Sequence, residues 1–67
     1  MHNITIGSPS ADEIKALIDA IPEDTKEIYL HCTAKHNFWC AAMAVELTRL
    51  GFTADTIVTF NSLTFKR

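Results

Sequence analysis

The segment Glu27-Ile28-Tyr29-Leu30-His31-Cys32 decides the fold that we expect for this chain. Apolar side chains fall on both faces of this stretch when it is extended, which is typical of a central strand that is covered on both sides. A polar loop over residues 23–26 precedes the strand, and a loop and an apolar helix follow it. This order of strand, loop and helix indicates an α/β domain.

Upstream of this strand, the sequence predicts a short strand over residues 4–6 and then an amphipathic helix. Ser10 and Glu13 have the spacing of a capping box, Ser8-Pro9 is an alternative start, and Pro22 stops the helix. The apolar face of the helix, spaced at i, i+3, i+4 and i+7, is formed by Ile14, Leu17, Ile18 and Ile21.

Downstream, the sequence predicts a second helix over residues 38–50, with Asn37 as its N-cap and Gly51 in a left-handed C-terminal cap. Its few polar side chains are those of Glu46, Thr48 and Arg49. A helix that is apolar around most of its circumference is either buried on two sides or carries an interaction face.

The C-terminal residues predict a hairpin of two strands, over 56–60 and 63–66, around the turn Asn61-Ser62. We therefore expect an α/β fold: a minimal β-α-β-α-β unit with a mainly parallel sheet and a C-terminal antiparallel strand at its edge. If the first three strands lie in sequence order, both helices cover one face and leave the other bare. If the first strand is central, the helices divide between the two faces.

Composition sets the class of protein. A chain of 67 residues is a single small domain, 1–67, and 48% apolar residues against 21% charged ones exceed what so short a chain readily buries. The net charge is −2 and the six basic residues are scattered, so we expect neither nucleic acid nor anionic lipid as a partner.

Length of the apolar stretches and cysteine content bear on location. The longest apolar stretch, residues 38–45, is too short to cross a bilayer, and the N-terminus lacks the features of a signal peptide. Two cysteines do not make a disulfide framework, which indicates thiols in a reducing compartment. We expect a cytoplasmic protein without membrane contact.

The candidate chemistry lies in the loop after the second strand. Cys32 stands at the carboxyl end of a strand, before a loop that opens a helix, where α/β sheets commonly place ligands. Backbone N–H groups there can bind an anion and lower the pKa of a cysteine. Cys32 is the candidate catalytic nucleophile, and the anion-binding loop consists of Thr33, Ala34, Lys35, His36 and Asn37.

Residues 13–60 resemble the carboxyl half of a rhodanese-like domain, through the strand Lys-Glu-Ile-Tyr-Leu-His-Cys, the cysteine loop and a helix ending Glu-Leu-Thr-Arg-Leu-Gly-Phe. The segment His31-Cys32-Thr33-Ala34 is also similar to the signature loop of the cysteine-dependent phosphatases. Both resemblances imply that Cys32 is a nucleophile. Phe38 and Asn37 occupy the positions where these families place an anion-binding arginine, and Lys35 replaces a loop glycine.

Other readings of these residues stay open. Cys40 is either a resolving thiol for Cys32 or a packing residue of the second helix. Neighbouring strand residues point to opposite faces, so His31 and Cys32 do not converge on a metal ion, and we expect no metal and no cofactor. Aromatic residues beside a polar loop have the composition of interface anchors. The predicted partner interface is Phe38, Trp39 and Met43.

Two functions follow from these patterns. The first is a small non-enzymatic interaction protein, of the size of the regulators and inhibitors that phages encode, on a degenerate rhodanese-like half-domain. It binds a protein partner or itself through the apolar second helix or a bare sheet face. The alternative is a minimal rhodanese- or phosphatase-like enzyme that uses Cys32.

Overall fold

The computed structural model describes residues 1–7, 10–33, 38–59 and 61–67, and the side chains of residues 38–40 are outside this description. These described residues form two helices and a four-stranded sheet. In chain order the elements are β1 (His2–Ile6), α1 (Ala11–Asp19), β2 (Glu27–Cys32), α2 (Phe38–Arg49), β3 (Thr53–Thr59) and β4 (Ser62–Lys66).

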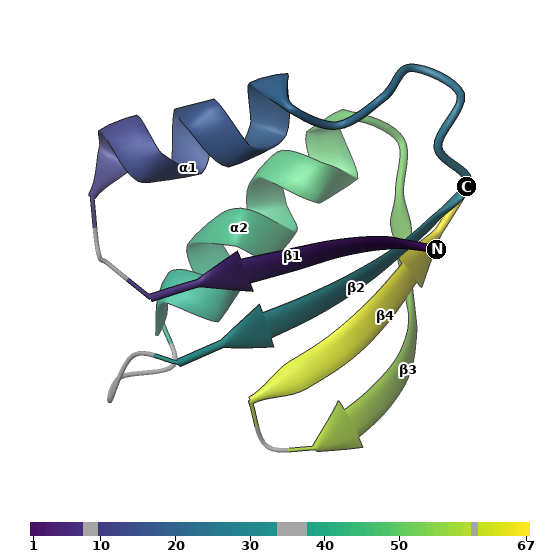
Figure 1. The fold of residues 1–67 in the computed structure, drawn as a ribbon. Coiled ribbons are helices and arrows are strands. Elements are labelled where there is room, and N and C mark those ends of the chain that lie inside the picture. Colours follow the sequence, from purple (N-terminus) through teal and green to yellow (C-terminus); the bar gives the residue numbers. More distant parts are fainter. Residues whose placement is uncertain (8–9, 34–37, 60) are drawn as a thin grey trace.

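The sheet is mixed rather than mainly parallel, which corrects the sequence-based prediction. The strand order is β1-β2-β4-β3. β1 and β2 pair in parallel, whereas β4 pairs antiparallel with both β2 and β3 (Figure 1). The C-terminal strand, predicted at the edge, is therefore inside the sheet, and β3 is the edge strand.

The side chains of the two C-terminal strands explain this order. β4 carries Phe65, which is fully buried, and Leu63, which packs against the core. All seven residues of β3 are exposed, and three of them are threonines. Because burying the Phe65 ring removes a large apolar surface from water, β4 is stabilised in the place beside β2. Ser62 already pairs with Thr59, so it belongs to β4 and not to the predicted turn.

Local signals set the helix ends. The Ser10 side chain accepts a hydrogen bond from the Glu13 backbone N–H at 3.0 Å, which confirms the predicted cap of α1. At the end of α2, Gly51 has a φ of 93°, as predicted. The Gly51 N–H donates to the Thr48 carbonyl and the Phe52 N–H to the Leu47 carbonyl, which is a Schellman motif.

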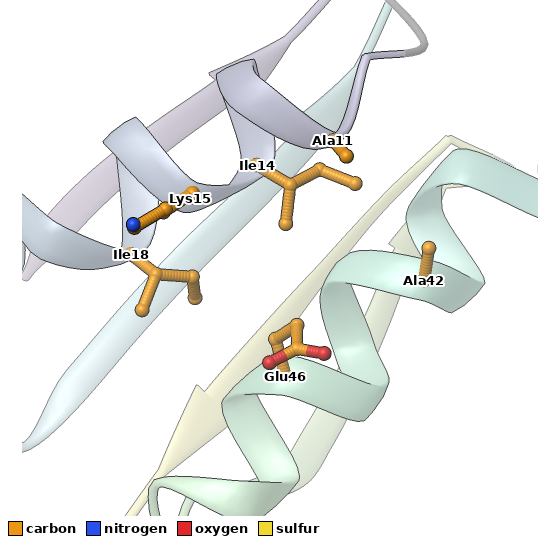
Figure 2. Close-up of a pocket in the computed structure, with 6 residues that line it drawn as sticks. All are labelled: Ala11, Ile14, Lys15, Ile18, Ala42 and Glu46. Atoms are coloured by element: carbon orange, nitrogen blue, oxygen red, sulfur yellow. The ribbon is translucent and has the colours of Figure 1, made fainter.

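Both helices lie on one face of the sheet (Figure 1). α1 runs beside α2, and Figure 2 shows Ile14 and Ile18 on the side of α1 that faces α2. No residue of α1 is fully buried. Among the described residues, no helix is long and apolar enough to span a membrane. Within the described ranges, no helix lies on the opposite face of the sheet, so β2 is central but is covered by helices on one side only, in contrast to the sequence-based prediction.

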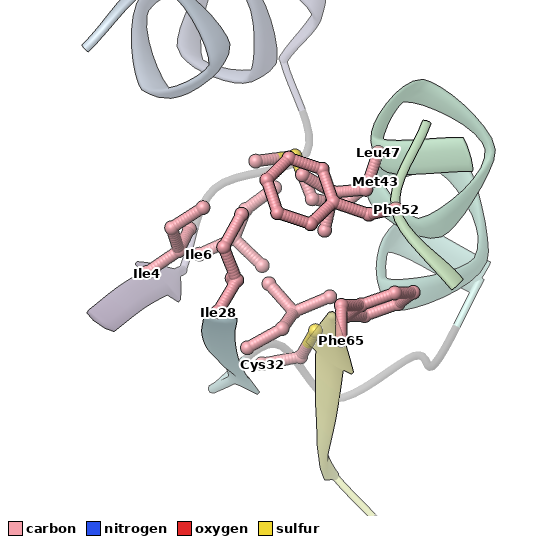
Figure 3. Packing of buried hydrophobic residues seen from close by; sticks show 9 residues of the cluster. Ile4, Ile6, Ile28, Cys32, Met43, Leu47, Phe52 and Phe65 are labelled. Carbon is pink, nitrogen blue, oxygen red and sulfur yellow. The ribbon is translucent and has the colours of Figure 1, made fainter. Parts of the chain in front are cut away.

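A single apolar core lies between the sheet and α2 (Figure 3). Alternate residues of β1 and β2 point into this core, and Met43 and Leu47 of α2 contribute its helical side. Its fully buried members are Ile4, Ile6, Ile28, Leu30, Cys32, Met43, Leu47, Phe52 and Phe65.

Arg67 connects the C-terminus to the loop before β2 and to the end of α2. Its guanidinium donates to the backbone carbonyls of Glu23 (2.7 Å), Thr25 (2.9 Å) and Leu50 (3.0 Å). The same group lies over the ring of Phe52, with 4.3 Å between Cζ and the ring centroid. The hydrogen bonds and the stacking hold the end of β4 against the loop before β2 and against the end of α2.

Candidate functional site

Cys32 does not present a thiol in this structure. Its side chain is 1% exposed, points into the core near Phe65 and is disulfide-bonded (Figure 3). The only other cysteine in the sequence is Cys40. The prediction of two thiols in a reducing compartment was therefore wrong for Cys32, and a disulfide sulfur buried in apolar surroundings is not a nucleophile.

Thr33 is the one residue of the predicted anion-binding loop that the structure describes, and it is hydrogen-bonded to β1. The Thr33 backbone N–H donates to the Ile6 carbonyl at 2.9 Å, and the Thr33 hydroxyl donates to the same oxygen at 3.3 Å. Thr33 thus extends the contact between β1 and β2 and offers no backbone N–H to an anion. The remaining loop residues, Ala34, Lys35, His36 and Asn37, lie outside the described residues.

The predicted partner interface on α2 is only partly described. The side chains of Phe38 and Trp39 are outside the described part of the chain. Met43 is fully buried against the sheet, so it cannot form part of a surface that contacts a partner, which corrects the prediction. The apolar pattern of α2 runs around the helix, and the sequence therefore did not show which side faces the sheet.

The outer side of α2 carries an exposed apolar side chain, Val45, together with the polar Thr48 and Arg49. Val45 is 52% exposed, although the opposite side of the helix fills the core, and Leu50, just after the end of α2, is 41% exposed. Ala41 is exposed on the same helix. Among the residues whose burial is described, Val45 is one of five exposed large apolar side chains, and no pattern in the sequence distinguishes it.

A shallow groove of about 340 Å³ separates α1 from α2 (Figure 2). It is lined by Ala11, Ile14, Lys15 and Ile18 of α1 and by Ala42 and Glu46 of α2. The Glu46 carboxylate is 3.0 Å from the Arg49 guanidinium. The groove therefore combines an apolar floor with charges of both signs.

The open face of the sheet, the bare face of one of the two predicted arrangements, is polar. The residues that alternate with the buried ones on β1 are Asn3 and Thr5, and those on β2 are Tyr29 and His31. Thr64 of β4 pairs with Tyr29 at the centre of this face. His31 and Cys32 thus point to opposite sides of the sheet, and among the described residues no group of acidic, histidine or cysteine side chains could hold a metal ion.

The edge strand β3 also exposes apolar side chains that the sequence did not predict to be exposed. Ile57 is 81% exposed and Val58 is 51% exposed. No local signal in the sequence distinguishes the two C-terminal strands, because Thr53–Thr59 and Ser62–Lys66 have similar shares of polar residues.

Comparisons with protein-family models, with curated proteins and with solved structures find no match.

Proposed function

We propose that this chain is a small non-enzymatic protein-binding module, of the regulator or inhibitor type, that contacts its partner through the helical layer. The observation that supports this most is the exposure of Val45 on a helix whose other side already fills the core. An apolar side chain at this position contributes nothing to the core, whereas burying it against a partner would stabilise a complex by about 1–2 kcal/mol.

The groove between α1 and α2 supplies a shaped part of the helical layer. Ile14, Ile18 and Ala42 can take an apolar side chain of a partner, and Lys15 and Glu46 can pair with polar groups around it. An apolar centre with a polar rim is the usual anatomy of a protein interface. The polar open face of the sheet offers no comparable apolar centre, so the helical layer is the better of the two surfaces that the sequence suggested.

The alternative function, an enzyme with Cys32 as its nucleophile, has no support from the geometry around this residue. The sulfur is buried and disulfide-bonded. The disulfide also removes the argument from free thiols for a cytoplasmic location. A kinship with rhodanese-like half-domains remains a proposal about origin, supported by the order of α1, β2 and α2 along the chain.

A photo-crosslinking experiment tests the helical surface. Benzoylphenylalanine is placed at Val45 on α2, at Thr5 on the open sheet face, or at Asp24 in an exposed loop, and each chain is irradiated in an extract of its source cells. We expect a discrete crosslinked protein from position 45 only. Val45→Lys in the unlabelled chain should abolish competition for that partner, and the matched control Asp24→Lys should retain it.

Two results would contradict the proposal. One is a partner that crosslinks from position 5 and is indifferent to Val45→Lys, which would move the interface to the sheet face. The other is a chain that yields no crosslink from any of the three positions.

A further inference from the structure

The disulfide-bonded Cys32 has a fixed place at the end of the central strand. Its side chain is 1% exposed and lies on the core side of β2 (Figure 3). Its backbone is held from both sides, because Cys32 pairs with Ile6 of β1 and its N–H donates to the Asn61 carbonyl at 2.9 Å. Only a sulfur atom that reaches the core can therefore bond to Cys32.

Sequence and helical spacing identify the bonding partner. The sequence has one other cysteine, Cys40, in the first turn of α2. Met43 and Leu47 of α2 are fully buried against the sheet, and residue 40 precedes them by i−3 and i−7, so it belongs to the same face of the helix. The Cys40 side chain itself is outside the described part of the chain. A cysteine of a second molecule would have to enter the core, so the spacing favours a bond within one chain.

The two ends of α2 are stabilised differently. At the C-terminal end, Gly51 closes the helix in a Schellman motif and the Arg67 guanidinium donates to the Leu50 carbonyl. The first turn carries no acidic side chain, although a negative charge there would interact favourably with the helix dipole. Helices of this length are marginal in water by themselves, so the first turn depends on tertiary contacts. A covalent bond between residue 40 and β2 is such a contact.

We propose that Cys32 and Cys40 form a redox switch that holds the first turn of α2 on the sheet when oxidised and releases it when reduced. The reductant is a dithiol. One of its thiolates attacks a sulfur of the bond and forms a mixed disulfide, and its second thiolate then displaces the protein sulfur. Both cysteine sulfurs leave with an electron pair and take up a proton, while the dithiol is oxidised to a cyclic disulfide.

The switch acts next to the groove between α1 and α2. Ala42 lines this groove and follows Cys40 by two positions along the helix. When the first turn is released, this wall of the groove loses its fixed position, and the reduced chain should bind a partner of the helical layer less tightly. This effect on binding rests on the proposed function, whereas the bond and its influence on α2 concern the chain alone. The two proposals can therefore fail separately.

Peptide mapping tests the bond. The full chain is equilibrated with an excess of oxidised glutathione, free thiols are blocked with N-ethylmaleimide, and trypsin then cuts after Lys35, between the two cysteines. We expect a chain that is monomeric on a non-reducing gel and in which peptides 27–35 and 36–49 are joined until dithiothreitol separates them. Blocked or glutathione-bound cysteines in separate peptides would overturn the proposal. So would a disulfide that joins two chains.

Thermal unfolding and backbone ¹⁵N relaxation test the effect of the bond on α2. Dithiothreitol should lower the Tm of the wild type by about 10 °C or more. At a temperature where both forms are folded, the order parameters of residues 39–42 should fall from about 0.85 to below about 0.6, while those of residues 46–49 stay unchanged. Cys40→Ser is the matched control, because it should resemble the reduced wild type and should not respond to dithiothreitol.

Three results of these measurements would contradict the switch. One is a Tm that reduction leaves unchanged. Another is a fall in Tm without a change in the order parameters of residues 39–42, because the bond would then stabilise the fold without controlling the first turn of α2. The third is a Cys40→Ser variant that responds to dithiothreitol as strongly as the wild type, because the reductant would then act elsewhere.

Discussion

Arg67 shows at the scale of one residue how this small chain holds its segments together. Its guanidinium bonds to carbonyls in the loop before β2 and at the end of α2, and it stacks on Phe52. We expect Arg67→Ala to lower the free energy of unfolding by about 1–2 kcal/mol. Arg67→Lys should recover little of this, because an ammonium cannot reproduce the planar fork that reaches three carbonyls.

Denaturant unfolding followed by circular dichroism measures this effect. Lys66→Ala is the matched control, because it removes only the exposed ion pair with Asp55 and should cost about 0.5 kcal/mol or less. Equal losses for the two variants would show that the guanidinium contacts contribute no more than a surface charge.

Gly7 makes a close approach that a larger residue cannot make. A Cβ at this position would lie 2.8 Å from the Thr33 hydroxyl oxygen, which donates to the Ile6 carbonyl. We expect Gly7→Ala to destabilise the wild type by about 1 kcal/mol, because the hydroxyl must move. In a Thr33→Ala background the same substitution should cost clearly less, and a double-mutant cycle measures the difference. If the costs of Gly7→Ala and Thr33→Ala simply add in the double mutant, the contact with the Thr33 hydroxyl is not the cause of the lost stability.

At the scale of the element, α1 and α2 differ in how firmly the core holds them. α1 has no fully buried residue, whereas α2 places Met43 and Leu47 in the core. Local opening requires the least free energy where the fewest apolar contacts break. We therefore expect the amides of α1 to exchange with deuterium faster than those of residues 43–49 in α2. Equal protection in the two helices would indicate that they open only together with the sheet.

The sequence predicts the ends of these elements better than it predicts their faces. The Ser10 cap and the left-handed Gly51 depend on a few neighbouring residues, and both are confirmed. The buried side of α2 depends instead on how the helix packs. Since its apolar residues surround the helix, nothing local distinguishes Met43, which is buried, from Val45, which is exposed. The candidate interface could therefore be placed on α2 but not on its outer side.

At the scale of the whole molecule, the strand order decides which residues carry stability. It was not predictable from the separate strands, because β3 and β4 compete for the same place beside β2. Phe65 of β4 is 1% exposed in the place beside β2, whereas Ile57 of β3 is 81% exposed at the edge of the sheet. Cys32 illustrates the same limit, since a disulfide depends on which residues the fold brings together rather than on cysteine count alone.

Paired truncations test this distribution of stability. Phe65→Ala should cost about 3–5 kcal/mol, which is a large share of the roughly 3–10 kcal/mol expected for a domain of this size. Ile57→Ala, measured in dilute solution, should cost less than about 1 kcal/mol. Thermal unfolding followed by circular dichroism compares the two variants with the wild type. A larger loss for Ile57→Ala would be incompatible with β3 at the edge.

The position of β4 also has a consequence for biosynthesis. β4 is the last of the four strands to be translated, yet it lies between β2 and β3. A nascent chain can form α1 and the β1–β2 pair early, but the second edge of β2 stays open until Ser62–Lys66 has left the ribosome. Phe65 reaches the core only then. Closure of the sheet is therefore a late event, and a ribosome stalled before β4 would hold a chain with its central strand uncovered.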